Sequence, residues 1–287
     1  MLNTASKFRI IHFLLLGFSA CILANSSSLL LHHRGLIIIE YQLLFSLTVG
    51  AYLLAHLTPM LNLETFNWKL INKSRKTILI CALLFISSIW PIFLFSYTSK
   101  FITYKHVYIL FLVILTTVFY FLRIRTSKKL YYGLREIPIL KNILLASIWT
   151  VATTYIPLIG TSINSDTMSL VVVRFSYIFV LCLMSDNRDI DYDRAKGITT
   201  ISLILGMKRT NYLIIAILIG ILVYTFLQPL TTTIWTPESK LALLASILLT
   251  IATIFLLKKN TKIKKATLII DSNLLIHGLL LTLINHL

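Results

Sequence analysis

Residues 184–197 of the chain read MSDNRDIDYDRAKG. This stretch holds four of the ten acidic residues of the whole chain, Asp186, Asp189, Asp191 and Asp193. It follows an apolar segment directly, in a chain that is otherwise rich in lysine and arginine. Carboxylates clustered at the end of an apolar helix are costly unless cations gather beside them. The stretch therefore indicates a cation-dependent site at the end of a helix.

The composition around this stretch is that of an integral membrane protein. Hydrophobic residues make up 57% of the 287 positions and charged residues only 13%, whereas soluble domains have about 25% charged residues. A helix of about 20 apolar residues crosses the hydrocarbon core of a bilayer. We predict an all-α membrane bundle of nine transmembrane helices that forms one domain, 1–287. The predicted spans are 8–31, 36–61, 77–98, 104–122, 139–161, 167–185, 211–230, 239–257 and 267–285.

The basic residues predict the orientation of the bundle. Of the 27 lysines and arginines, 22 lie in the N-terminal segment or in the loops that follow the second, fourth, sixth and eighth predicted spans. The positive-inside rule places those segments in the cytoplasm. We expect a protein of the bacterial inner membrane with a cytoplasmic N-terminus, a cytoplasmic acidic cluster and an external C-terminus. The net charge of +17 then reflects topology and contact with anionic membrane lipids, and it does not indicate a nucleic-acid partner.

The spacing of the acidic cluster favours a metal site. If the helix of the sixth span continues through it, Asp186, Asp189 and Asp193 share one face, while Asp191 points away. Carboxylates this close repel one another unless a cation lies between them, and hard oxygen ligands suit Mg²⁺ better than zinc. Basic residues beside them would suit a diphosphate carried on a lipid tail. The alternative is a solvated acidic loop balanced by its own arginines.

A second basic segment, residues 123–141, contains aromatic residues as well. It is either a patch that touches lipid headgroups or a clamp for an anionic ligand.

Residues 186–200 have the pattern DxxDxxxDRxxGxxT and are followed by ISLILG. This pattern resembles the second aspartate-rich motif of the UbiA superfamily of intramembrane prenyltransferases. Residues 131–142, YYGLREIPILKN, are similar to that family's segment after its fourth helix. The pattern differs from that of the CDP-alcohol phosphotransferases, which would have glycine where this chain has Ile190.

The resemblance implies transfer of an isoprenoid chain from a prenyl diphosphate to an aromatic or other lipid acceptor, as in quinone biosynthesis. It implies Mg²⁺ held by Asp186, Asp189 and Asp193. It also implies that basic residues contact the diphosphate, and the candidates are Arg135, Lys141, Arg194 and Lys196.

One part of the family's pattern is missing. Where the family has its first aspartate-rich motif, residues 61–69 read LNLETFNWK, with Glu64 as the only acidic residue. The chain could therefore be a non-catalytic protein that binds prenyl diphosphates or quinone-like lipids. A cation-coupled transporter is a further alternative, because ionisable residues interrupt the predicted spans. These residues are His12, His56, Arg174, Asp271 and His277.

Two of these residues carry specific expectations. Arg174 lies near enough to the outer end of its span for its side chain to reach the membrane surface. Asp271 is expected to pair with a lysine of the segment 262–265, or to face the cavity as a carboxylate on the acceptor side.

Overall fold

The computed structural model describes residues 4–57, 115–117, 120, 124–125, 131–132, 137–155, 157, 163–229, 234–257 and 261–284. Within these residues the chain is helical apart from one short antiparallel ribbon. The longer helices are α1 (Thr4–His32), α2 (Ile38–Leu57), α5 (Leu140–Thr150), α6 (Ser165–Lys196), α8 (Met207–Leu227), α9 (Pro237–Leu256) and α10 (Ile263–Ile284). The shorter elements are the π-helical turn η2 (Val151–Tyr155), the helix α7 (Ile201–Leu205) and the strands β1 (Ile124–Arg125) and β2 (Tyr131–Tyr132).

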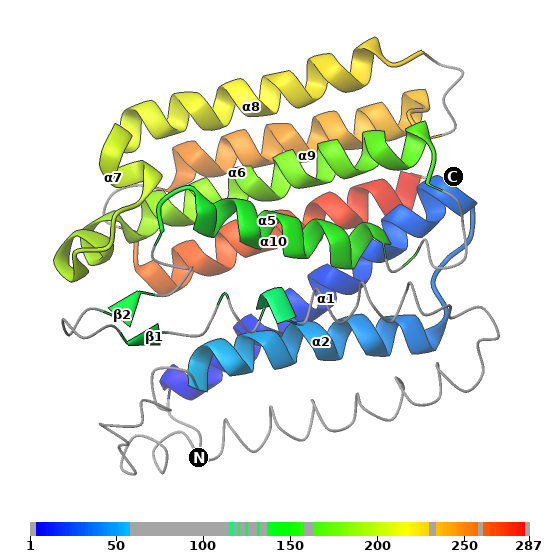
Figure 1. Cartoon of the computed structure of the whole chain (residues 1–287). Coiled ribbons are helices and arrows are strands. Elements are labelled where there is room, and N and C mark those ends of the chain that lie inside the picture. Colours follow the sequence, from blue (N-terminus) through cyan, green and yellow to red (C-terminus); the bar gives the residue numbers. More distant parts are fainter. Residues whose placement is uncertain are drawn as a thin grey trace.

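The helices form a bundle around α6 (Figure 1). Helix α6 packs against α5, α8 and α10, and α10 packs in turn against α9 and α1. Helix α2 lies on α1. The core between them is apolar, and large hydrophobic side chains such as Leu227, Phe255 and Leu256 are exposed on the outside. An apolar exterior of this kind suits helices surrounded by lipid.

The predicted fold class is confirmed. Five helices of the described part are long and apolar enough to cross a membrane, namely Phe8–His32, Ser165–Ala195, Met207–Leu227, Pro237–Leu256 and Ile263–Leu283. The predicted spans 36–61 and 139–161 coincide with α2 and with α5 plus η2. The predicted span 77–98 and most of 104–122 lie outside the described residues, so the total of nine stays a prediction.

Helix α6 continues through the acidic cluster, as the spacing of its aspartates requires. The helix begins after Asn164, whose side chain accepts a hydrogen bond from the backbone N–H of Thr167. It ends at Gly197, which has a φ of 68° and adopts the left-handed conformation. The N–H of Ile198 donates to the carbonyl of Asp193, which completes the helix-ending turn that favours glycine. The glycine of the motif thus stops the helix directly after its aspartates.

The threonine and the second glycine of the motif also shape the backbone. Thr200 caps α7, because its side chain accepts a hydrogen bond from the N–H of Leu203. Gly206 has a φ of 82° and joins α7 to α8. The trailing half of the motif is therefore a pair of tight turns that brings α8 back along α6.

The expectation for Arg174 is wrong. Its side chain is 0% exposed and does not reach the surface. Its Nη2 donates to the carbonyl of Leu23 at 3.2 Å and to the hydroxyls of Ser26 and Ser27 at 2.9 and 3.1 Å. Because α1 offers these oxygens inside the bundle, the guanidinium stays there.

Candidate functional site

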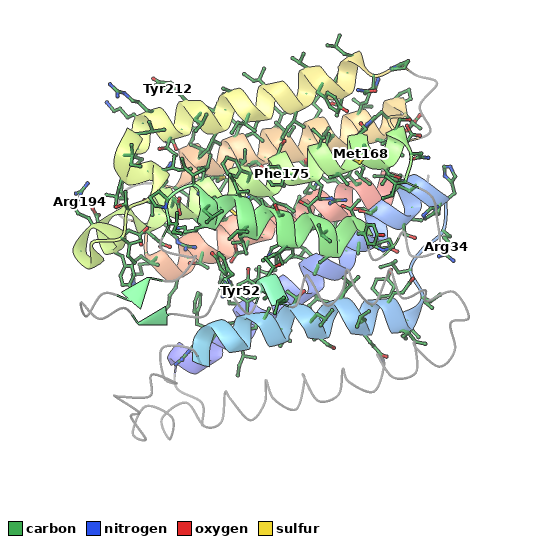
Figure 2. All side chains as sticks on the ribbon, in the orientation of Figure 1. Arg34, Tyr52, Met168, Phe175, Arg194 and Tyr212 are labelled. Atoms are coloured by element: carbon green, nitrogen blue, oxygen red, sulfur yellow. The ribbon has the colours of Figure 1, made fainter. Side chains whose placement is uncertain are left out.

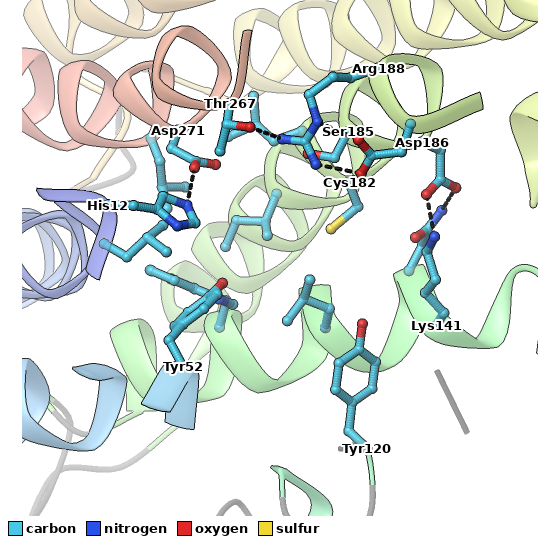
Figure 3. Close-up of a pocket in the computed structure, with 18 residues that line it drawn as sticks. His12, Tyr52, Tyr120, Lys141, Cys182, Ser185, Asp186, Arg188, Thr267 and Asp271 are labelled. Carbon is cyan, nitrogen blue, oxygen red and sulfur yellow. Dashed lines mark hydrogen bonds and ion pairs between the residues drawn. The ribbon is translucent and has the colours of Figure 1, made fainter. Parts of the chain in front are cut away.

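A pocket of about 330 Å³ opens among α1, α2, α5, α6 and α10 at the end of the bundle where α6 terminates (Figure 3). Arg194 marks this end in Figure 2, and Arg34 lies at the opposite end. The polar lining residues are His12, Tyr52, Tyr120, Lys141, Asn142, Ser185, Asp186, Arg188, Asp189, Thr267 and Asp271. The remaining lining residues are Leu16, Leu145, Trp149, Ile178, Leu181, Cys182 and Leu274.

The lining changes from polar to apolar along the bundle axis. Helices α1, α5 and α10 begin at this end, and their first lining residues are His12, Lys141 and Thr267. The next lining residues along the same helices include Leu16, Leu145 and Leu274. Helix α6 runs the other way and shows the same order, with apolar lining residues first and the acidic cluster last. The pocket therefore suits an amphiphile with an ionic head and an apolar tail.

Asp186 is fixed by two residues of α5. Its Oδ1 lies 2.6 Å from Lys141 Nζ, and its Oδ2 accepts a hydrogen bond from Asn142 Nδ2 at 2.8 Å. The carboxylate side chain is only 3% exposed, so it needs this compensation. Helix α5 places both partners in its first turn, after a backbone turn at Pro138 and Ile139.

Asp189 is held by Arg188. The guanidinium donates from Nε to Oδ1 at 2.7 Å and from Nη2 to Oδ2 at 2.5 Å, which is a bidentate pair. Its Nη1 donates to the hydroxyl of Thr267 at 3.0 Å and so links α6 to α10. This part of the pocket thus presents two carboxylates on α6, each beside one permanent cation.

Asp271 pairs with histidine instead of lysine. Its Oδ2 lies 2.6 Å from His12 Nε2, and the two side chains are 18% and 19% exposed. The expectation of a lysine partner is therefore wrong, whereas the alternative that Asp271 faces the cavity is confirmed. Helix α1 packs along α10, so that His12 meets Asp271 across 259 positions of sequence. The ring of Tyr52 lies edge-on to His12, with their centroids 6.1 Å apart.

The remaining predicted residues do not line the pocket or are not described. Asp193 is buried in α6 but is not among the lining residues. Arg194 is 69% exposed and lies 3.8 Å from Asp191, so this pair is on the surface. Arg135, Glu64 and the side chain of Lys196 lie outside the described residues.

The polar end of the pocket offers two carboxylates to a magnesium ion. Asp186 and Asp189 stand one helical turn apart and both line the pocket. Within the described ranges, no group of three or more His, Cys, Asp or Glu side chains is arranged around a common point. Mg²⁺ commonly uses only one or two carboxylates, together with water and phosphate oxygens. The two aspartates thus fit an ion that shares its coordination with a phosphate-bearing ligand.

Several lining residues were missed by the sequence analysis. Arg188 was counted among the basic residues beside the aspartates but was not named as a diphosphate contact, although it follows Leu181 and Ser185 at helical spacing and therefore shares their face. Asn142 and Tyr52 carry no signal of their own. The pairing of His12 with Asp271 depends on the packing of the first helix against the last, which local sequence does not encode.

Comparison with known proteins supports the fold. No family model matches the chain, and no curated protein does. The structure of a digeranylgeranylglyceryl phosphate synthase matches with a TM-score of 0.56 at 13% identity, over 96% of this chain and 97% of that one. The apo structure of a UbiA homologue from Aeropyrum pernix K1 matches with a TM-score of 0.59 at 12% identity, over 93% and 97%.

A UbiA homologue from Archaeoglobus fulgidus, bound to GPP and Mg²⁺, has 10% identity and a TM-score of 0.49, over 96% of this chain and 98% of its own. The two better matches show that the chain has the UbiA fold, which confirms the fold that the aspartate-rich motif implied.

Proposed function

We propose that this chain, which has the UbiA fold, binds a prenyl diphosphate in the pocket and transfers the isoprenoid chain to a lipid or aromatic acceptor. The observation that carries the proposal is the ordered lining, with ionic groups at one end and apolar groups at the other. The isoprenoid chain would lie along Leu145, Trp149 and Leu181. The diphosphate would lie beside Lys141 and Arg188.

The charges of the pocket require an added cation for this ligand. Lys141 and Arg188 contribute positive charge, while Asp186, Asp189 and Asp271 contribute negative charge. A diphosphate brought into this lining would meet carboxylates that already outnumber the permanent cations. The negative charges of the diphosphate and of the carboxylates would repel one another strongly in a site that is partly shielded from water. We therefore infer that Mg²⁺ enters with the diphosphate.

Asp186 and Asp189 would hold this ion. When bound, Mg²⁺ would neutralise charge on the diphosphate as it leaves. Lys141 and Arg188, which now contact the same aspartates, are close enough to the polar end to turn toward phosphate oxygens. We leave Asp193 out of this ligand set because it does not line the pocket.

In the transfer one bond breaks and one bond forms. The bond between C1 of the prenyl chain and the diphosphate oxygen breaks, and its electron pair leaves with the oxygen. The acceptor forms a new bond to C1 and loses one proton, which the released diphosphate can accept. The apolar wall that includes Leu16, Trp149 and Leu274 would exclude water from the electron-poor carbon. We place this site at the cytoplasmic face, because the basic loops gather there.

A second candidate is a binding protein without chemistry. Two observations favour it: the first aspartate-rich motif is missing, and the oxygens of Asp186 and Asp189 already have partners within the chain. Transport has less support, because His12 pairs with Asp271 and the buried ring of His277 contacts Ser246 and Tyr177.

The test is equilibrium binding of geranylgeranyl diphosphate to the purified full chain, with and without Mg²⁺, followed by measurement of diphosphate release after an aromatic hydroxyl acceptor such as 4-hydroxybenzoate is added. Mg²⁺-dependent binding with release supports the transferase. Binding without release supports the second candidate. Absence of binding under both conditions overturns both.

A further inference from the structure

We propose that Asp271, positioned by His12, forms a subsite for a hydroxyl group of the acceptor. The inference rests on the proposed function, because it places the acceptor in the same pocket as the prenyl diphosphate. It assigns a chemical class to the acceptor, namely a molecule that presents a neutral O–H group to a carboxylate.

The two ends of the polar lining differ in the charge that they offer. Asp186 has a lysine and an amide as partners, and Asp189 has a bidentate arginine. Within the described ranges, Asp271 pairs only with His12, which is not a permanent cation, while the charge of Arg188 acts on it without a direct pair. A phosphate at Asp271 would therefore meet a poorly compensated negative charge. A hydroxyl group would instead donate to one of the strongest hydrogen-bond acceptors available in a protein.

The orientation of Asp271 suits such a contact. In Figure 3 its carboxylate lies next to the His12 ring on the pocket wall, and a dashed line joins the ring to one of its two oxygens. One oxygen, Oδ2, faces His12, which leaves Oδ1 on the pocket side. Thr267 and Arg188 lie between Asp271 and Asp186 in the same view, so Asp271 is separated from the carboxylate that is proposed to hold the metal ion.

The aromatic side chains around the pair support the same class of ligand. Tyr52 and Phe8 flank the His12 ring, with centroid separations of 6.1 and 6.0 Å. Of these rings, Tyr52 lines the pocket. A flat hydrophobic body that carries a hydroxyl would pack on Tyr52 while its O–H reaches Asp271.

The His12–Asp271 pair lies on the pocket wall and not in the most closely packed part of the α1–α10 contact. The α1–α10 contact is already close deeper in the bundle, where a Cβ on Gly278 would come within 2.9 Å of Ile22 Cγ2 and 3.0 Å of the Leu23 backbone nitrogen. The His12–Asp271 pair lies instead on the pocket wall, where both side chains keep nearly a fifth of their exposure. A polar pair that only joined the helices could be replaced by apolar residues without loss of stability.

The test compares two small probes that differ by one hydroxyl, 4-butylphenol and butylbenzene. Binding of each to the full chain in lipid nanodiscs is measured by calorimetry, with empty nanodiscs as the blank. We expect the phenol to bind at least about tenfold more tightly, the ratio typical of a hydrogen bond to a charged group. Equal affinity of the two probes for the unmodified protein overturns the proposal.

Three variants locate the contact. In Asp271→Asn the phenol preference should fall by about fivefold or more, because a neutral amide is a weaker acceptor. In the double variant His12→Leu and Asp271→Leu it should vanish, while the apolar replacement of the pair keeps the helices packed. In His12→Gln most of it should remain, because the amide N–H can still donate to Asp271. A preference that survives in the double variant overturns the proposal.

Binding of geranylgeranyl diphosphate with Mg²⁺ serves as the control in every variant. It should change by much less than the phenol preference does, because the Asp271 carboxylate pairs with His12 and not with Lys141 or Arg188, and it also reports that each variant is folded. Loss of donor binding in the unmodified protein would count against the proposed function. Loss of the phenol preference alone would count against the acceptor subsite.

Discussion

Two buried polar regions of the same bundle differ in what surrounds them. At the end where α6 terminates, Lys141 and Arg188 pair with aspartates on the wall of a pocket. Toward the opposite end, Arg174 is fully enclosed and, in the described part of the chain, donates to a carbonyl and two hydroxyls of α1. Nearby, Tyr177 stacks on His277 with their centroids 3.9 Å apart, and Tyr177 also hydrogen-bonds Thr250 at 2.7 Å.

The comparison teaches that a charged residue inside a membrane helix is not by itself a functional site. Arg174 and His277 satisfied the same sequence criterion as His12 and Asp271. The distinguishing features are a cavity beside the side chain and a carboxylate within reach, and both depend on tertiary packing. We therefore propose a functional role for the pocket and a structural role for the enclosed cluster.

The sharpest way to test this division is to remove one cation from each region. Lys141→Met leaves Asp186 buried with only Asn142 as a partner, and we expect it to lower the free energy of unfolding by about 3 kcal/mol or more and to weaken donor binding. Arg174→Met replaces an arginine that has no carboxylate partner among the described residues, and it should change stability by less than about 1 kcal/mol. Unfolding in mixed detergent with increasing dodecyl sulfate measures both.

Equal destabilisation by the two substitutions would contradict the division. It would mean that the enclosed arginine carries as much stability as the pocket lysine. The serine hydroxyls freed by Arg174→Met still donate to the Leu23 carbonyl, so no buried donor is left without a partner there.

The second prediction concerns the metal ligands. Asp189→Asn removes a carboxylate from the pocket, and Mg²⁺-dependent binding of geranylgeranyl diphosphate should weaken by about a hundredfold, or about 2.7 kcal/mol. Asp191→Asn makes the same chemical change two positions away, on a side chain that is 77% exposed. It should leave binding within about twofold of the unmodified protein. Similar losses in both variants would indicate a general charge effect instead of a metal site.

The third prediction tests the packing of α1 on α10, which brings His12 and Asp271 together. A methyl group at Gly278 would meet the backbone of α1, which cannot move aside easily, so Gly278→Ala should lower the free energy of unfolding by about 1 to 3 kcal/mol. Gly220→Ala is the matched control, because nothing lies within 4 Å of its added Cβ. That substitution should be neutral or stabilising, since alanine favours a helix by about 1 kcal/mol. Thermal unfolding of the two variants in the same detergent decides between these outcomes.

Much of the fold follows from the sequence because its signals are local. The length of each apolar run predicts a membrane-spanning helix. Asp186 and Asp189 fall on one face of α6 because an α-helix has a fixed number of residues per turn. The motif also fixes where α6 ends, because Gly197 adopts the left-handed conformation that glycine tolerates better than other residues.

The candidate site was only partly predictable, for physical reasons that its residues illustrate. Lys141 was identified because it lies in a motif-like segment, but its contact with Asp186 depends on how α5 packs on α6. Arg194 was expected to bind substrate because it lies beside the aspartates in sequence, yet helical rotation carries it to the surface. Asp271 was expected to choose a nearby lysine, and the packing of α1 brought His12 instead.

The last prediction has the smallest effect and separates the two halves of the aspartate-rich motif. Gly197→Ala forces a residue with a Cβ into a φ of 68°, which should lower the free energy of unfolding by about 1 kcal/mol. Nothing lies within 4 Å of the added Cβ, so the cost comes from the backbone alone. Mg²⁺-dependent donor binding should persist, because Asp186 and Asp189 lie two turns or more before the glycine. If the substitution abolishes binding without loss of stability, the glycine belongs to the ligand site and the trailing half of the motif does more than end the helix.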